Sequence, residues 1–521
     1  MRKLLFVFCF LLGLLSIANA QNQTANPINI GFSNIDEEIR NLQLLGKVDS
    51  NQSLAVRPFY TSAHQSYGNL LNAIDPNFHY NAPQLNWNGL HIEALPISLT
   101  QKINTNRPFG WNDQAMGFTK GYQAQLTTGL YAKWGIFNAQ YQPELVNYAN
   151  GDFQHKTKLL PGQSFVGIRA AGLSLGISSE NLWWGPGQFS SLTMSNNAQG
   201  FEHIRLNSTR PLNIGIGKIE FQLILGRLTR DTSQGWENNN LQKRSFDFAT
   251  QPNFRQYNGL NIAFQPKFAK NLFIGFTRAF DNYEITPKKG YNFLSTYLPV
   301  LNGLFKNNYS DDTLNKDQIL SLYTRWLFPN NHAEIYFEYG YNDAMQNLRD
   351  LLIDMSHSGA YTFGFKKLHP LNDVENSFLT LNFEATKMSQ TPSYLQRNAG
   401  NWYEHGQVTE GITNQNQIMG AGSGMGNDVQ TIVLGWQQGF TKLGFKFQHI
   451  ANNPYLVNRQ NAVELRNTKW DDYVFGANGG YRYKNIIINA NLEWVNARNY
   501  NWVNATHLGN LHAFINTIFL W

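Results

Sequence analysis

Alternation of apolar and polar side chains along many short segments is the feature that most restricts how this chain can fold. One such segment spans residues 122–130, where mostly apolar side chains share one face and polar side chains share the other. The first set is Tyr122, Ala124, Leu126, Thr128 and Leu130, and the second is Gln123, Gln125 and Thr127. The same period of two recurs at residues 137–142 and 219–225. This period predicts β-strands that have one apolar face and one wet face.

Composition indicates where such strands can be stable. After the first 20 residues no run of ~18 apolar residues occurs, so the sequence predicts no transmembrane helix. Charged residues make up only 15% of the chain and aromatic residues 14%, whereas soluble domains carry ~25% charged residues. We therefore predict an all-β fold, a transmembrane antiparallel β-barrel of about 16–18 strands whose outer wall faces outer-membrane lipid. The alternative, a secreted β-propeller or β-helix, would need a repeat of ~20–50 residues, and we find none.

The beginning of the chain has the pattern of an export signal. A positive start and an apolar segment are followed at residues 18–20 by Ala-Asn-Ala, which fits the signal-peptidase rule. We expect residues 1–20 to be a signal peptide, and because it contains the single cysteine, Cys9, we expect no disulfide in the exported chain. Apolar residues at helical spacing then predict a small helical, periplasmic N-terminal element over residues 21–85. The barrel would occupy residues 86–521.

Several function classes find no support in the sequence. The formal net charge is +6 without any Lys/Arg-rich run, so nucleic acid is not an expected partner. His357, His405 and His449 lack the spacing of metal ligands, and the glycine-rich segment 420–426 lacks the Lys-Ser/Thr of a phosphate-binding loop. We expect no metal, no cofactor and no catalytic residues, and hence no enzyme.

One predicted hairpin carries charged side chains on its polar face. If Phe328 pairs with Ala333 across the turn, Arg325 lies between Glu334 and Glu338 on the lumenal side. Oppositely charged neighbours stabilise each other across a sheet, so we interpret these three residues as a structural charge ladder. The alternative, a pair of catalytic carboxylates, has no second signal to support it.

The last alternating strand, residues 511–521, ends on the aromatic Trp521. It resembles the terminal strand of bacterial outer-membrane barrels, whose final aromatic is read by the barrel assembly machinery. We therefore expect that machinery to be a partner during insertion.

The stretch 178–201 contains adjacent tryptophans, Trp183 and Trp184, before a Gly-Pro-Gly turn and an amide-rich segment. It lies between two predicted strands and therefore in a long connection, which in such barrels faces the cell exterior. One interpretation is structural, with the tryptophans in an interfacial girdle or in a loop folded as a plug. The other is a polysaccharide-binding site, in which the rings stack on sugars and nearby amides bind hydroxyl groups. Its candidate residues are Trp183, Trp184, Asn196, Asn197 and Gln199.

The same stretch, WWGPGQFSSLTMSNNAQGFEHIRL (residues 183–206), resembles the signature of Wzi-type capsule assembly proteins. Further likenesses follow in the expected order at residues 104–131, 317–343, 355–368 and 391–428. The resemblance implies an outer-membrane β-barrel lectin of 18 strands that holds capsular polysaccharide on a Gram-negative cell. It also implies an N-terminal helical bundle at the periplasmic side and extracellular loops that close the pore. Because glycan contacts vary within that family, the identity of the polysaccharide is not implied.

Two other functions stay open from the sequence. A barrel of this kind can be a porin or channel for small solutes, or it can be one subunit of a larger surface-export complex with other export proteins as partners. Conductance in planar bilayers separates the porin from a closed lectin, and co-purification would reveal a complex.

Overall fold

The computed structural model describes residues 27–28, 35–60, 67–148, 157–231, 254–283, 297–301, 316–342, 358–372, 376–389, 401–405, 408, 410–453 and 468–521. The expected signal peptide at residues 1–20, and with it Cys9, lies outside these residues, as does His357. Among the described residues no helix is long and apolar enough to cross a membrane.

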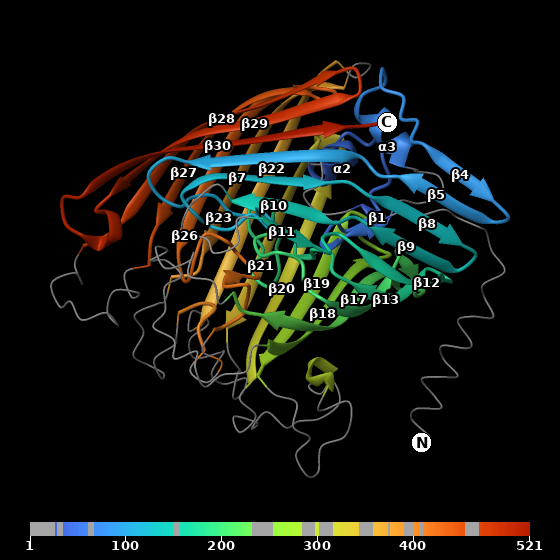
Figure 1. Cartoon of the computed structure of the whole chain (residues 1–521), viewed down its shortest axis with the longest axis horizontal. Helices are drawn as coiled ribbons and strands as arrows, with labels where there is room; N and C mark the ends of the chain where they lie inside the picture. Colours follow the sequence, from blue (N-terminus) through green and yellow to red (C-terminus); the bar gives the residue numbers. More distant parts are fainter. Residues whose placement is uncertain are drawn as a thin grey trace, which may run out of the picture.

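A single large antiparallel sheet closes on itself, because the last strand, β30 (His507–Phe519), pairs with β6 (Ile97–Asn104). Figure 1 shows the strands running obliquely around this ring. Four of the strands are interrupted, so each of them carries two labels. When each interrupted strand is counted once, the described residues form a barrel of 18 strands, of which fourteen are uninterrupted. The predicted barrel fold is confirmed.

The interrupted strands are β5 (Leu90–Ala94) with β6, β7 (Gly121–Thr127) with β8 (Leu130–Trp134), β9 (Phe137–Tyr141) with β10 (Glu144–Tyr148), and β11 (Thr157–Leu160) with β12 (Phe165–Ala170). The uninterrupted strands are β13 (Leu173–Ser178), β15 (His203–Ser208), β17 (Gly217–Thr229), β18 (Phe254–Pro266), β19 (Leu272–Asn282), β20 (Lys316–Phe328), β21 (Ala333–Asn342), β22 (Gly359–Asn372), β23 (Ser377–Lys387), β26 (Asp428–Gln438), β27 (Thr441–Ala451), β28 (Asp471–Tyr483), β29 (Ile486–Arg498) and β30. Short strands β4 (Gln84–Trp87) and β16 (Leu212–Asn213) extend the sheet at one rim.

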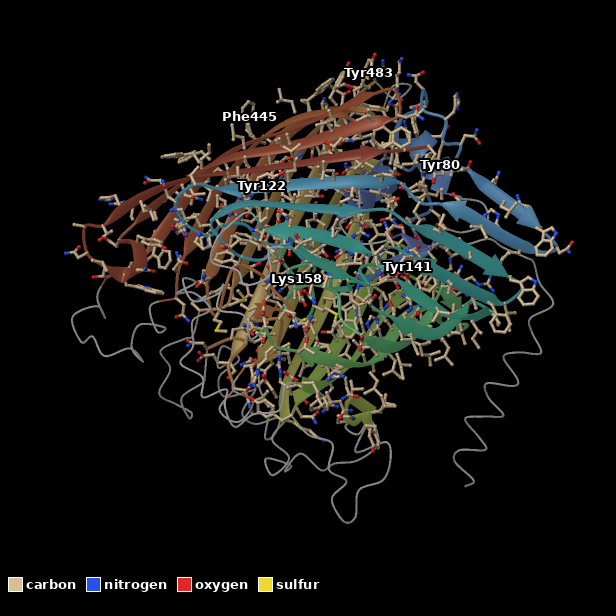
Figure 2. The ribbon with its side chains drawn as sticks, viewed as in Figure 1. Tyr80, Tyr122, Tyr141, Lys158, Phe445 and Tyr483 are labelled. Atoms are coloured by element: carbon tan, nitrogen blue, oxygen red, sulfur yellow. The ribbon has the colours of Figure 1, made fainter. Side chains whose placement is uncertain are left out.

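The wall is apolar outside and polar inside, as the alternation predicts. On β29, for example, Leu492 and Trp494 are exposed, whereas Asn489 and Glu493 are buried. Phe445 and Tyr483 are also exposed and stand out from the wall (Figure 2). In a membrane, lipid covers such a surface. Tyr483, the last residue of β28, lies at the rim of the wall, where tyrosine is common at the membrane interface.

The two ends of the barrel differ in their connections. Short turns join the strands at one end, as at residues 329–332 and 484–485, and long connections join them at the other. In outer-membrane barrels the short turns face the periplasm and the long loops face the exterior. The C-terminus lies at the short-turn end, together with α2 (Ile35–Leu44) and α3 (Tyr67–Ile74) (Figure 1).

These two helices belong to an N-terminal element that fills the barrel lumen near its periplasmic end. Leu44, in the last turn of α2, packs among Phe273, Leu327, Leu368 and Phe378 on the inner wall. The apolar side of α3 packs in the same way in a cluster that includes Phe440, Ile487 and Ile518. Short strands β1 (Pro27–Ile28), β2 (Val56–Arg57) and β3 (Phe59–Tyr60) complete the element. The apolar faces of both helices, which helical spacing in the sequence predicts, thus pack against the inner wall of the barrel.

Two tyrosines lie across glycines of neighbouring strands on the inner wall. Tyr323 is paired with Gly275, and Tyr336 with Gly364. A Cβ added to Gly275 would lie 2.0 Å from Cζ of Tyr323, and one added to Gly364 would lie 1.9 Å from Cζ of Tyr336. The glycines therefore provide the space in which these buried rings rest. Tyr336 uses this position to donate a hydrogen bond to Glu384 at 2.7 Å.

We expect Gly364→Ala to destabilise the barrel by about 1–3 kcal/mol, because the added methyl group must displace a fully buried ring from a packed interior. The matched control is Gly479→Ala, since a Cβ there meets only Lys442 O at 3.6 Å. The readout is the temperature at which the folded, fast-migrating form is lost on a gel. Equal temperatures for both variants would contradict the steric role of Gly364.

Candidate functional site: the tryptophan loop and a lumenal cavity

The connection from β13 to β15, residues 179–202, is the tryptophan loop. It starts at the extracellular end but folds into the lumen, where Trp183–Trp184 form strand β14. This strand pairs with β2 of the N-terminal element, with Trp183 opposite Arg57 and Trp184 opposite Val56. The next residue, Gly185, donates its N–H to Ala55 O at 2.9 Å. A loop from the outside and an element at the periplasmic end therefore meet inside the barrel.

Trp184 is the anchor of this loop. Its ring is fully buried and lies against Gly259 on β18, where an added Cβ would approach the ring to 2.3 Å. Its indole N–H donates to Gln222 Oε1 at 2.6 Å, which satisfies the polar atom of the ring. Leu192, Met194 and other buried side chains complete the cluster around it. These contacts describe a packed interior position with no free ring face.

Trp183 differs from its neighbour because it borders a cavity. The guanidinium of Arg57 lies over its ring, with Cζ 4.5 Å from the ring centroid. Arg57 also donates to Asp36 Oδ2 at 2.8 Å and to Gly187 O at 3.3 Å, so it ties α2 to the turn after the tryptophans. Burial lowers the pKa of Arg57 to about 10, although Asp36 opposes this shift, and Arg57 remains charged at neutral pH. The indole N–H of Trp183 has no hydrogen-bond partner among the described residues.

The three predicted amide residues also occupy different positions. Asn196 lines the cavity and donates through Nδ2 to Asn112 O at 3.3 Å. Asn197 donates to Ile418 O at 2.8 Å, and its Oδ1 accepts from the Asn112 N–H at 3.4 Å. Gln199 is half-buried, and its backbone carbonyl accepts from Asn414 Nδ2 at 3.1 Å. Of the five predicted residues, the structure brings Trp183 and Asn196 together at the cavity, while the other three hold the loop.

The cavity has a volume of about 310 Å³ and lies in the middle of the lumen. Its walls come from α2 and Arg57, from the tryptophan loop, from the β6–β7 loop (residues 105–120) and from the inner faces of β27, β29 and β30. Aromatic rings contribute Phe109, Trp111, Trp183, Phe189 and Phe514, and amides contribute Asn112, Gln188, Asn196, Gln448, Asn489 and Asn491. Flat apolar surfaces beside amide groups match a saccharide, which has apolar C–H faces and a rim of hydroxyl groups.

Sequence reasoning missed most of these residues. Asn489 and Asn491 can be assigned to the inner face of their strand by counting alternate positions, but nothing in the sequence marks them as a site. Trp111 lies in a loop, and its approach to Trp183 depends on how two loops far apart in sequence fold into the same lumen.

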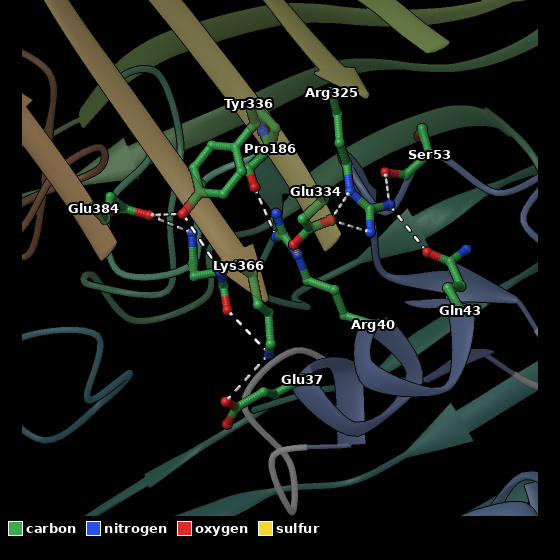
Figure 3. A network of polar contacts seen from close by, with 12 residues as sticks. Glu37, Arg40, Gln43, Ser53, Pro186, Arg325, Glu334, Tyr336, Lys366 and Glu384 are labelled. Carbon is green, nitrogen blue, oxygen red and sulfur yellow. Dashed lines mark hydrogen bonds and ion pairs between the residues drawn. The ribbon is translucent and has the colours of Figure 1, made fainter. Parts of the chain in front are cut away.

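The charged residues of the β20–β21 hairpin hold the N-terminal element and the tryptophan loop. Phe328 pairs with Ala333, as predicted, and Arg325 contacts Glu334 at 2.8 Å and 2.7 Å. Figure 3 shows that Arg40 of α2 also bonds to Glu334, and that Arg325 reaches Gln43 Oε1 at 3.0 Å. Burial disfavours the charged form of Arg40, but Glu334 outweighs it and raises the pKa of Arg40. One carboxylate thus joins two buried guanidinium groups.

Two further carboxylates of the inner wall receive backbone N–H groups of the tryptophan loop. Glu338 accepts from Leu192 N at 3.3 Å and from Ser321 Oγ at 2.7 Å. Glu384 accepts from Gln188 N at 2.7 Å and from Phe189 N at 3.2 Å. The loop is therefore fixed by wall residues directly behind the part that borders the cavity.

The geometry defines a class of protein: a closed antiparallel barrel with an apolar outer wall and a polar, filled lumen is an outer-membrane β-barrel protein. The chain belongs to the capsule assembly protein Wzi family, whose model matches residues 100–469. The predicted family, fold and outer-membrane location are confirmed.

One solved structure has the same fold. The chain is similar to Wzi, an Escherichia coli outer-membrane protein described as a carbohydrate-binding β-barrel involved in group 1 capsule assembly, with 12% identity, a TM-score of 0.62, and 95% of this chain and 99% of that chain covered. It is more distantly similar to a BenF-like porin from Pseudomonas fluorescens, with 9% identity, a TM-score of 0.40, and 82% and 99% coverage. No curated protein sequence matches the chain significantly.

Proposed function

We propose that this protein binds a surface polysaccharide and keeps it attached to the outer membrane. The observation that carries the proposal is the lumenal cavity, which combines aromatic rings with amides and is lined by Trp183 and Asn196 of the tryptophan loop. Similar proteins support the same role, since the Escherichia coli barrel of this fold is described as carbohydrate-binding. In this proposal Trp183 and Asn196 contact sugar, whereas Trp184, Asn197 and Gln199 act on binding by holding the loop.

We propose that this role is binding without catalysis. Each of the four carboxylates that line the cavity lies within ion-pair distance of a cation. Asp36 is 2.8 Å from Arg57, Asp113 is 2.7 Å from Lys102, Glu493 is 2.8 Å from Lys446, and Glu37 is 3.7 Å from Lys366. Each of these four side chains is thus held by a cation of the protein, which is the arrangement of structural ion pairs.

The direct test is surface retention. Deleting this protein should leave polysaccharide synthesis intact while shifting polysaccharide from the cells into the medium. Cell-bound and released polysaccharide would be measured separately and compared with a strain that carries the intact protein on a plasmid. An unchanged ratio in the deletion strain would remove the proposed function.

A second prediction concerns conductance, which separates a closed lectin from a porin. Because the N-terminal element and the tryptophan loop meet in the lumen, we expect the purified barrel to be nearly silent in planar bilayers. A general porin reconstituted under the same conditions is the control. Steady open-channel currents would favour the porin function, and co-purification of export proteins in mild detergent would favour a subunit of a larger complex.

A further inference from the structure

We propose that the lumenal cavity binds the end of a polysaccharide chain, as one or two terminal sugar units, and not a segment within a passing polymer. This inference rests on the proposed function, and it specifies which part of the polysaccharide the cavity binds. Three features of the cavity carry it: a closed floor, a small volume and a wall chemistry suited to a single ring.

The floor of the cavity is formed by the N-terminal element. Asp36, Glu37 and Arg40 of α2, together with Arg57, border the cavity from the periplasmic side. Beneath them α2 is fixed to the short-turn end, where Leu44 O contacts His332 Nδ1 at 2.9 Å. A polymer that threads through a site needs an entrance and an exit. Here the exit is occupied by a helix held by buried ion pairs, so a chain entering from the exterior must stop.

The volume sets the length of what can enter. At about 310 Å³ the cavity lies at the lower limit of small-molecule sites, which span roughly 300–1,000 Å³. Such a space holds one or two sugar rings, and the rest of a longer chain must extend out of it. Solvent reaches it, because Asn491 points into the barrel and is nevertheless exposed, and the Glu37 side chain is 45% exposed.

The walls present complementary chemistry on opposite sides. Trp183, with one ring face covered by Arg57, and Trp111 come from the two loops, while Asn489 and Asn491 come from the β29 wall. A terminal ring between them can stack on the half-buried indole of Trp111 and bind amides with its free hydroxyl groups. A chain terminus has one hydroxyl more than an internal unit, and a site built to bind that group discriminates strongly against units that lack it.

The test asks whether competition by soluble polysaccharide depends on the number of chain ends or on the mass of polysaccharide added. The strain's own capsular polysaccharide, purified and immobilised, would capture the full-length barrel in detergent, and soluble polysaccharide of different lengths would compete. Fragments about ten times shorter carry about ten times more ends per gram, so they should compete about ten times better by mass. Equal competition by mass, or better competition by long chains, would overturn end binding and leave polysaccharide binding intact. If neither polymer nor fragments bind, the proposed function itself fails.

A variant locates the site independently. Asn491→Trp places a large ring in the cavity at a position exposed to solvent, and Asn496→Trp places the same ring on the outer face of the same strand. We expect at least about tenfold weaker fragment binding for Asn491→Trp and no change for Asn496→Trp, with both migrating as folded barrels. Unchanged binding by Asn491→Trp would overturn the cavity as the site. If that variant fails to assemble, the competition with the unaltered protein still decides between ends and mass.

Discussion

Trp184→Ala is expected to destabilise the barrel by about 3–5 kcal/mol, the range for removing a fully buried large aromatic side chain. The ring fills space against Gly259 and within the cluster of Leu192 and Met194, and its loss also leaves Gln222 without its indole partner at 2.6 Å. The surrounding wall is a closed hydrogen-bonded ring, so it cannot collapse into the space that the side chain leaves.

Trp183→Ala is the matched comparison in the same loop. This ring is also buried, at 3% exposed, but it borders a cavity, so its removal enlarges a space that already exists, and the loss of its contact with the Arg57 guanidinium is worth about 0.5–2 kcal/mol. We expect this variant to keep its folded gel mobility while more polysaccharide is released into the medium.

The two variants are compared by the melting temperature of the folded gel form and by released polysaccharide per folded barrel. If Trp183→Ala lowers the melting temperature as much as Trp184→Ala, or if its released fraction stays at the level of the unaltered protein, the division of roles between the two rings is wrong.

Glu334→Leu is expected to have an effect of similar size, about 3–5 kcal/mol, because removing one partner of a buried ion pair leaves the other charge uncompensated. Here two guanidinium groups, Arg40 and Arg325, lose the carboxylate that they share. Since α2 is held by this contact, the loss also loosens the floor of the cavity.

Arg325→Leu should cost less, about 1–3 kcal/mol, because Glu334 keeps its ion pair with Arg40. Phe337→Leu, on the outer face of the strand that carries Glu334, is the control for the substitution itself. Thermal loss of the folded gel form ranks the three variants. An effect of Arg325→Leu that equals or exceeds that of Glu334→Leu would contradict the shared-carboxylate arrangement.

Local patterns in the sequence were enough to predict the wall of the barrel. Alternation assigned inner and outer faces, and the register of Phe328 with Ala333 followed from the turn between them. The contacts of the predicted charge ladder on the β20–β21 hairpin were predicted less well. Arg325 contacts Glu334, whereas Glu338 accepts from Leu192 and Ser321, because the tryptophan loop enters the lumen and supplies donors that strand pairing cannot reveal.

The sequence by itself determined that this chain is a membrane barrel, since a strand in lipid must place apolar side chains outward at every second position and close its edges. Only the tertiary structure decided what adjacent residues do inside it. Trp183 and Trp184 are adjacent residues of the same type, but they occupy different positions because β14 pairs with β2. This pairing turns the Trp184 ring into the packed wall and the Trp183 ring toward the cavity. The floor, the loops and the wall of that cavity come from segments hundreds of residues apart. Their meeting depends on closure of the whole barrel, which no local pattern encodes.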